Sequence, residues 1–268
     1  MAIKTFSWND IINSNSRELF PQATGISVGS FDGLHLGHRV LLNALVDGCR
    51  KKSLKSGVIT FLRPLPSIKH SGDYKGDVST LNQRLKLFES LGIDFAVLVD
   101  FNEAFAGIAG ADFLNILLKS CNMKLLAEGI DFRCGYKGAT DAQAIKYWAE
   151  QNNVECIFVD PVYYREGTDE DERVSSSYIR QMIQKGFFAT VEELLERPYE
   201  LDFTEIRKRL EGDVKVLDGS GAAPIESLQI LPPDGIYRTQ SENGELYRLE
   251  IKNGKLVHLP DYKSVKFL

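Results

Sequence analysis

The chain has 268 residues, 43% of them apolar and 26% charged, and a formal net charge of −5. These values are typical of a soluble globular protein with one large or two small domains. No apolar run approaches the about 20 residues that span a bilayer, and no basic stripe indicates a nucleic-acid groove. We therefore expect neither a membrane nor a nucleic-acid partner. A small anionic ligand in a local positive pocket remains compatible with the net charge.

The cysteines Cys49, Cys121, Cys134 and Cys156 are scattered and form no C-x-x-C pair. This spacing favours free thiols in a reducing compartment over a disulfide framework. No apolar segment typical of a secretory signal follows Lys4. The sequence therefore predicts a cytoplasmic protein, and it indicates no protein partner.

The first two thirds of the chain alternate between predicted strands and helices. Short apolar runs, which suit parallel strands buried on both faces, occur at residues 26–28, 58–61, 95–99, 124–127 and 154–159. Helical periodicity occurs at residues 40–51, 81–91, 111–120 and 141–151. Thr80 and Gln83 form a capping-box pattern before the second of these helices, and Gly92 is expected to end it. The pattern predicts a Rossmann-like, doubly wound parallel sheet with ligands beyond the carboxyl ends of its strands.

The string GSFDGLHLGH, residues 29–38, follows the first strand and leads into a helix. Backbone N–H groups and the helix dipole attract anions at such a corner, and glycine lets a phosphate approach the backbone. His35 and His38 lie three residues apart, share one helix face and are two of the four histidines in the chain. The string therefore predicts chemistry on a phosphoryl group.

Other interpretations of this string fit less well. Phe31 occupies the second glycine position of the dinucleotide fingerprint, and no Gly-Lys-Ser/Thr marks a Walker loop. A zinc site would need further ligands at suitable spacing, which the sequence lacks. The two histidines alone could be ordinary surface or core residues, so the prediction depends on the whole string.

The serines Ser175, Ser176 and Ser177 precede a second helical segment, with Arg180 one turn further on. One serine is expected to cap the helix. The remaining hydroxyl and N–H groups, with the Arg180 guanidinium, suit another phosphate. The alternative is that the serines only cap a surface helix.

The composition changes near residue 200. Residues 187–196 and 202–210 are predicted helices, and turn signals then recur, including Asn243-Gly244 and Asn253-Gly254. Residues 246–251 and 255–259 are plausible paired strands. We therefore expect one domain over residues 1–200 and a small antiparallel β module over residues 201–268. The module would be marginal alone and is expected to pack on the first domain.

Residues 29–38 resemble the H-x-G-H signature of the nucleotidyltransferases, in the G-x-F-D-G-x-H-x-G-H form of the bacterial FAD synthetase family, the bifunctional riboflavin kinase/FMN adenylyltransferases. Four more segments resemble that family's motifs in the same order. They are FLRPLP (61–66), GIDFRCG (129–135), VSSSYIR (174–180) and ERPY (196–199).

The resemblance implies FMN adenylyltransferase activity, which makes FAD and pyrophosphate from FMN and ATP, with Mg²⁺ bound to ATP. It implies catalytic roles for His35, His38 and Arg180. The ATP-binding residues that it implies are Gly29, Ser30, Phe31, Asp32, Gly33, His35, His38, Ser175, Ser176, Ser177 and Arg180. The flavin-binding residues that it implies are Phe61, Pro64, Pro66, Asp131, Phe132 and Tyr136. The alternative for Asp32 is a structural role in orienting the turn. The alternative for Phe61 and Phe132 is that they are core residues.

Two departures from the family pattern bear on function. Cys134 stands where relatives often carry Phe, so Tyr136 or Tyr74 is a substitute stacking partner for the flavin. The kinase segment G-F-P-T-x-N is absent, although LPPDGIY (231–237) resembles a strand entry of the kinase barrel. The tail is therefore interpreted as a reduced remnant without kinase activity. The alternatives are another H-x-G-H adenylyl- or cytidylyltransferase, a bifunctional enzyme that keeps kinase activity, and a non-catalytic flavin-binding module.

Overall fold

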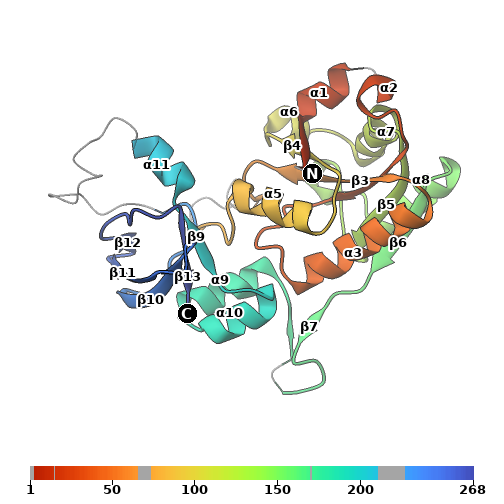
Figure 1. The fold of residues 1–268 in the computed structure, drawn as a ribbon. Helices are drawn as coiled ribbons and strands as arrows, with labels where there is room; N and C mark the ends of the chain where they lie inside the picture. Colours follow the sequence, from red (N-terminus) through yellow and green to blue (C-terminus); the bar gives the residue numbers. More distant parts are fainter. Residues whose placement is uncertain (1–2, 15, 66–73, 170, 211–226) are drawn as a thin grey trace. The chain divides into compact units, whose positions relative to one another are not determined.

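The structure, a computed structural model, describes residues 3–14, 16–65, 74–169, 171–210 and 227–268 (Figure 1). The chain forms two compact units. The first unit comprises Met1–Phe31, Gly37–Lys69 and Leu85–Val162. The second unit comprises Asp32–Leu36, His70–Arg84 and Tyr163–Leu268.

A six-stranded parallel sheet forms the centre of the first unit, in the order β1-β4-β3-β2-β5-β6. The strands are β1 (Lys4–Ser7), β2 (Thr24–Val28), β3 (Lys55–Phe61), β4 (Phe95–Val99), β5 (Met123–Gly129) and β6 (Glu155–Val159). The five predicted strands are confirmed. β1 was not predicted because it buries only Phe6 and lacks an apolar run.

Helices cover both faces of this sheet. They are α1 (Trp8–Asn13), α2 (Ser16–Leu19), α3 (Leu36–Lys51), α5 (Leu81–Ser90), α6 (Glu103–Ala106), α7 (Gly110–Ser120) and α8 (Ala142–Gln151), with a 3₁₀ turn η1 (Tyr136–Gly138). Gly48 and Cys49 of α3 pack against Leu125 and Gly25 on one face. The helices α1, α7 and α8 bury side chains in the core on the other face, and Figure 1 shows α3 in front of the sheet and α7 behind it.

The four predicted helices of the first two thirds are confirmed, and their ends follow the predicted signals. Thr80 N–H donates to Gln83 Oε1 (2.9 Å) and Gln83 N–H donates to Thr80 Oγ1 (3.2 Å), so the capping box is present. Gly92 takes the left-handed conformation (φ +81°) directly after α5. All four cysteines are free thiols.

The direction in which the chain moves across the sheet reverses between β2 and β5. From β2 the chain passes to β3 and then β4 on one side, whereas from β5 it passes to β6 on the other. A crevice forms at such a switch point because the two sets of connections lie on opposite faces. The loops that follow β2 and β5 are therefore the expected ligand-binding loops.

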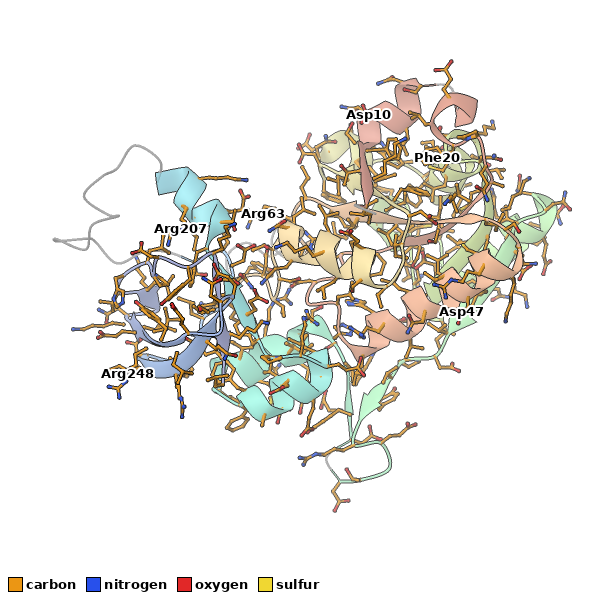
Figure 2. The ribbon with its side chains drawn as sticks, viewed as in Figure 1. Asp10, Phe20, Asp47, Arg63, Arg207 and Arg248 are labelled. Carbon is orange, nitrogen blue, oxygen red and sulfur yellow. The ribbon has the colours of Figure 1, made fainter. Side chains whose placement is uncertain are left out.

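Aromatic side chains fill much of the core on the α7 face. The Phe20 ring lies 5.1 Å from that of Phe6 and 4.8 Å from that of Phe95, and Figure 2 marks Phe20. Near α6, the Phe105 ring contacts those of Trp8 (5.0 Å) and Phe61 (6.0 Å). The two pairs of Phe105 are edge-to-face, and pairs of this kind add about 0.5–1.5 kcal/mol each beyond the burial of their area.

The second unit contains a five-stranded antiparallel sheet in the order β12-β11-β10-β13-β9. Its strands are β9 (Glu200–Asp202), β10 (Gly235–Ser241), β11 (Leu246–Lys252), β12 (Lys255–Leu256) and β13 (Ser264–Phe267), and β7 (Tyr163–Tyr164) pairs separately with β8 (Glu172–Arg173). Its helices are α9 (Ser176–Gln184), α10 (Phe188–Leu195) and α11 (Thr204–Leu210). The predicted hairpin is confirmed, because Asn253 (φ +53°) and Gly254 (φ +68°) join β11 to β12.

The two units divide the chain at a different place from the predicted boundary at residue 200. The helices α9 and α10 belong to the same unit as the β module. Phe188 of α10 stacks on Phe267 of β13 at 4.4 Å, and Tyr199 stacks on the same ring at 5.6 Å. α10 thus packs on the small sheet through aromatic rings, which turn signals along the sequence do not reveal.

Candidate active site

The turn after β2 has an unusual backbone. Phe31 (φ +48°), Gly33 (φ +79°) and Leu34 (φ +43°) all lie in the left-handed region, which costs free energy for residues other than glycine. A Cβ at Gly33 would lie 2.8 Å from Val78. Such a turn persists only where the surrounding structure holds it.

Asp32 holds this turn from within the second unit. Its side chain is 1% exposed and accepts hydrogen bonds from Val78 N (3.0 Å), Ser79 N (2.9 Å) and Ser79 Oγ (3.2 Å). Gly33 N–H donates to Ser79 Oγ at 2.7 Å. The Asp32 carboxylate therefore has the orienting geometry that the sequence left open as its alternative role.

Arg180, on α9, forms a buried ion pair with Asp32. Its Nε donates to Gly76 O (3.0 Å), and its guanidinium lies over the Tyr74 ring at 4.9 Å. Tyr74 in turn donates to Asp77 Oδ1 at 2.6 Å, and burial raises the pKa of the Tyr74 hydroxyl. The Arg180 guanidinium thus interacts with protein groups that adjoin the turn.

A second buried cation lies near this ion pair. Arg84 is fully buried, and burial lowers the pKa of its guanidinium while Asp32 and Asp77 oppose that shift. Arg197, from the ERPY segment, donates to Gly33 O at 2.5 Å. The sequence analysis assigned no role to Arg84 or to Arg197, although Arg197 lies in the ERPY segment. It named Tyr74 as a substitute stacking partner for the flavin, whereas the Tyr74 ring lies against the Arg180 guanidinium.

The serine turn meets the glycine-rich turn within the second unit. Ser175 is the N-cap of α9 and accepts from Tyr178 N–H at 3.1 Å, which confirms the predicted cap. Ser176 Oγ donates to Asp32 O at 2.8 Å. Ser177 is exposed. The structure therefore joins the beginning of α9 to the turn that contains His35.

The two histidines flank the beginning of α3. His35 directly precedes the helix and is buried, and His38 lies in its first turn and is half-buried. The His38 ring meets the edge of the Phe31 ring at 5.3 Å. Phe31 is itself 2% exposed and also contacts Phe88, so its side chain packs in the core beside His38.

A cavity of about 470 Å³ opens in the first unit at the carboxyl ends of β2 to β5. Its walls are mostly apolar and aromatic, and its rim carries the cations Arg133 and Lys137. The lining residues are Val28, Gly29, Ser30, Phe61, Leu65, Phe101, Phe105, Ala106, Ile108, Phe113, Phe132, Arg133, Cys134, Gly135, Tyr136, Lys137 and Gly138. A cavity of this size and character suits a planar organic ligand.

The cavity brings together some of the predicted flavin residues and not others. Phe61, Phe132 and Tyr136 line it, and so do Gly29 and Ser30 from the predicted ATP set. Pro64 is buried and Asp131 is exposed, and neither lines this cavity. Pro66 lies outside the described residues.

One buried acid near this cavity was missed by the sequence analysis. Glu128 lies near the end of β5, is 1% exposed and accepts from Val28 N–H at 2.7 Å. Burial raises the pKa of its carboxyl well above the usual range. The available signal was a single acid in the otherwise apolar run from Leu125 to Gly129.

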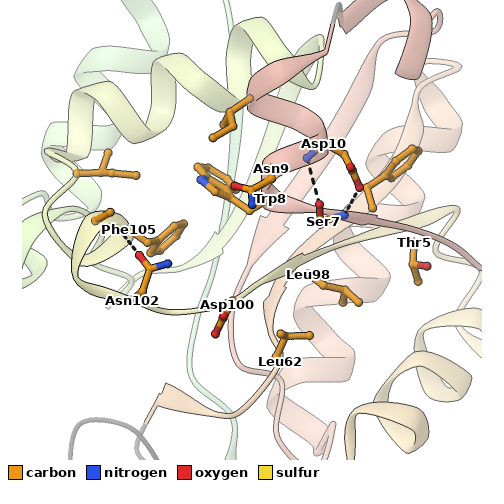
Figure 3. A pocket seen from close by; sticks show the side chains of 14 residues that line it. Thr5, Ser7, Trp8, Asn9, Asp10, Leu62, Leu98, Asp100, Asn102 and Phe105 are labelled. Carbon is orange, nitrogen blue, oxygen red and sulfur yellow. Dashed lines mark hydrogen bonds between the residues drawn. The ribbon is translucent and has the colours of Figure 1, made fainter.

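A second cavity, of about 610 Å³, lies at the carboxyl ends of β1 and β4 (Figure 3). Trp8, Leu62 and Leu98 contribute apolar walls, and Asp100 and Asn102 contribute polar ones. Phe105 and Ile108 line both cavities. None of the site residues predicted from the sequence lines this second cavity.

The described part of the chain lacks two features. No helix there is both long and apolar enough to span a bilayer. Across the same residues, no group of three or more His, Cys, Asp or Glu side chains is placed to hold a metal ion.

The doubly wound sheet, with a glycine-rich turn and two histidines after β2, defines an α/β protein of the nucleotidyltransferase type. The FAD synthetase family matches residues 18–178, more than half of the chain. The chain therefore belongs to the FAD synthetase family.

Individual relatives agree with this assignment. The bifunctional riboflavin kinase/FMN adenylyltransferase of Bacillus subtilis is 28% identical over 83% of this chain and 69% of its own length. Its counterpart in Buchnera aphidicola (subsp. Schizaphis graminum) is 30% identical over 71% of this chain and 57% of its own. The FAD synthetase of Listeria monocytogenes is 23% identical over 82% of each chain. The matched region thus spans between about half and two thirds of the bifunctional relatives.

A solved structure resembles the whole chain. The macrolide-efflux protein from Streptococcus pneumoniae superimposes with a TM-score of 0.73 over 99% of this chain and 98% of its own. The two sequences are 22% identical, so the likeness concerns the fold alone. It extends through the β module as well as the parallel sheet.

Proposed function

We propose that this protein is an FMN adenylyltransferase, which converts ATP and FMN to FAD and pyrophosphate. The observation that carries the proposal is the 470 Å³ cavity at the switch point of the sheet. One cavity is lined both by Gly29 and Ser30, which begin the phosphate-binding turn, and by the aromatic residues Phe61 and Phe132. A flavin phosphate needs both kinds of surface next to each other.

The chemistry fits a site without a nucleophilic side chain. The phosphate oxygen of FMN attacks the α-phosphorus of ATP, a new P–O–P bond forms, and the bond to the leaving pyrophosphate breaks. The attacking oxygen is already anionic at neutral pH, so no general base is required. The enzyme must align the two phosphates and stabilise the added negative charge.

Separate groups are proposed for the two substrates. His35 and His38 donate to the triphosphate, and at least one of them acts on the α-phosphate in the transition state. The serine turn and the N–H groups at the beginning of α9 hold the outer phosphates. Arg180 contributes a fixed positive charge from behind the turn, where it pairs with Asp32.

The flavin ring is proposed to occupy the aromatic cavity. Phe61, Phe132 and Tyr136 line that cavity, and Tyr136 is 53% exposed, so its ring is accessible for stacking. Cys134 supplies a smaller wall where relatives often carry Phe. Pro64, Pro66 and Asp131 stay as proposed contacts of the flavin or its ribityl chain.

Mg²⁺ is proposed to enter with ATP rather than to bind a site of its own. The Asp32 carboxylate is occupied by hydrogen bonds and by Arg180, which makes it a poor metal ligand. Magnesium bound to substrate phosphates is the usual arrangement for this ion. A cytoplasmic site of action suits the four free thiols.

The test is to mix purified protein with Mg-ATP and either FMN or riboflavin, and to separate the flavins by chromatography. FAD and an equal amount of pyrophosphate should form from FMN, and riboflavin should remain unchanged because G-F-P-T-x-N is absent. Conversion of riboflavin to FMN would show kinase activity in the tail.

Parallel reactions address the remaining alternatives. Pyrophosphate release from ATP or CTP with nicotinamide mononucleotide, phosphopantetheine or phosphocholine, and not with FMN, would indicate another transferase of the H-x-G-H group. Flavin binding without pyrophosphate release from any pair would indicate a non-catalytic module.

A further inference from the structure

The two central strands of the sheet separate at their carboxyl ends. β2 stays paired with β3 up to Val28, opposite Ile59, and β5 stays paired with β6 up to Gly129. Pairing between β2 and β5 themselves ends earlier, at Ile26 and Leu126. The gap lies at the switch point, between the two loops that carry the proposed site.

The side chain of Glu128 bridges this gap. Gly29 N–H donates to Ile59 O of β3 at 3.0 Å. Successive backbone N–H groups of a strand point to opposite sides, so Val28 N–H points toward β5. There it meets the Glu128 carboxyl, whose Oε1 accepts at 2.7 Å. A side chain therefore replaces the ladder hydrogen bond that the separated strands cannot make.

The surroundings of Glu128 favour its neutral form. Among the described residues, Glu128 acts electrostatically on the thiols of Cys134, in the loop after β5, and Cys156, on β6. Burial raises the pKa of Cys134 to about 12 and that of Cys156 to about 11, so neither thiol is charged at neutral pH. Burial raises the pKa of the Glu128 carboxyl, and the hydrogen bond from Val28 N–H opposes that shift only in part.

We propose that Glu128 is a positioning residue for adenylyl transfer. Its hydrogen bond fixes the phosphate-binding turn, which begins one residue after Val28, relative to the flavin loop, which begins one residue after Glu128. The inference rests on the proposed function, since both loops must present their substrates in line. Displacement of either loop by about 1 Å is enough to cost roughly 100-fold in rate.

Ionisation of Glu128 would oppose the reaction in a second way. Both substrates are anionic, and Val28, which Glu128 contacts, lines the cavity proposed for the flavin. A carboxylate buried there would repel the reacting phosphates through surroundings of low dielectric constant. Turnover is therefore expected to fall as Glu128 loses its proton.

Three variants of the full-length chain test the inference. Glu128→Gln keeps an acceptor for Val28 N–H and cannot ionise, whereas Glu128→Leu removes the acceptor at similar volume. Ser27→Ala is the matched control, because the Ser27 hydroxyl is buried beside Val28 and has no hydrogen-bond partner among the described residues. We expect kcat within about threefold of wild type for Glu128→Gln and Ser27→Ala, and at least about tenfold lower for Glu128→Leu, with a smaller change in KM.

Two further measurements distinguish a positioning role from a merely structural one. They are the pH dependence of kcat and hydrogen exchange at the Val28 amide, which a structural role would not change together. The alkaline decline of kcat in wild type should be absent or shifted in Glu128→Gln. Hydrogen exchange at Val28 should be faster in Glu128→Leu and unchanged in the other two variants, whatever the activity.

The outcomes separate the inference from the proposed function. If wild type makes no FAD, the proposed function fails, and exchange at Val28 still tests the hydrogen bond. If wild type makes FAD and Glu128→Leu matches it in kcat, or keeps Val28 protected, the positioning role is overturned. If Glu128→Leu does not fold, the comparison of wild type with Glu128→Gln decides. An alkaline decline of kcat that is identical in these two proteins overturns the positioning role.

Discussion

The Asp32 side chain stabilises the turn after β2 by satisfying several buried donors at once. Two backbone N–H groups, the Ser79 hydroxyl and the Arg180 guanidinium all donate to it. Replacing Asp32 with Ala would leave the Arg180 charge buried without its partner, and breaking a buried pair in this way costs about 3–5 kcal/mol. Urea denaturation of Asp32→Ala should show a loss of that size.

The exposed pair between Asp47 and Arg50 on α3 provides the control for this prediction. Their side chains are 64% and 72% exposed, and Figure 2 marks Asp47 on the helix. Surface pairs of this kind contribute about 0–1 kcal/mol. Asp47→Ala should therefore denature almost as wild type does, and equal losses in both variants would contradict the role given to Asp32.

His38 is expected to act in the transition state rather than in folding. It is half-buried at the beginning of α3, so its replacement by Ala leaves the core intact. Loss of one transition-state donor costs about 2.7–4 kcal/mol, equivalent to 100- to 1,000-fold in kcat. Steady-state FAD formation measures the effect, with the thermal midpoint as the control for folding. Unchanged turnover would remove His38 from the site.

Glu128 makes stability depend on pH in a predictable direction. Its pKa in the folded state is raised well above the ordinary value of 4.5, so the folded chain keeps a proton that the unfolded chain releases. The contribution of Glu128 to the free energy of unfolding is fully present below pH 4.5 and falls as the pH rises toward the folded pKa, by about 1.4 kcal/mol per pH unit. Glu128→Gln cannot ionise and should lack this pH dependence. Its free energy of unfolding, measured by denaturation, should therefore exceed that of wild type by an amount that grows from pH 5 to pH 7. A constant difference would show that the carboxyl titrates normally.

At the scale of elements, the beginning of α9 separates two roles of neighbouring serines. Ser175 caps the helix by accepting from Tyr178 N–H, whereas Ser177 is exposed within the first turn. Ser175→Ala should cost about 1 kcal/mol of stability. Ser177→Ala should change stability by less than about 0.5 kcal/mol, and it should raise the KM for ATP if Ser177 holds a phosphate. Thermal denaturation and steady-state kinetics of the pair distinguish the two roles.

At the scale of the whole molecule, the β module is part of the second unit and not an appendage. β13 pairs with β9, and Phe267 stacks on Phe188 and Tyr199. Deleting residues 212–268 removes β10 to β13, including Phe267, and so uncovers the rings of Phe188 and Tyr199. We expect the truncated chain to lose cooperative unfolding of the second unit and to lose at least about 100-fold in FAD formation, because the Asp32–Arg180 turn belongs to that unit. Retained activity would show that the turn is held without the module.

Local sequence was sufficient for five strands and four helices of the α/β part of this protein and for the two turns of the candidate site. Apolar runs predicted five of the six strands of the parallel sheet. Thr80, Gly92 and the serine run 175–177 marked helix ends where the structure has them. These features depend on residues that are neighbours along the chain. The same pattern predicted that the quoted motifs lie together, because each follows a strand and parallel strands place their carboxyl ends on one edge of the sheet.

Only the tertiary structure decided which distant groups became partners. Asp32 and Arg180 are separated by 148 positions, and Val28 and Glu128 by 100. Neither pairing leaves a periodic trace in the sequence, because a buried charge or an unpaired N–H group is satisfied by whatever side chain the fold brings within about 3 Å. The packing of α10 on the small sheet arose in the same way, from the rings of Phe188 and Phe267.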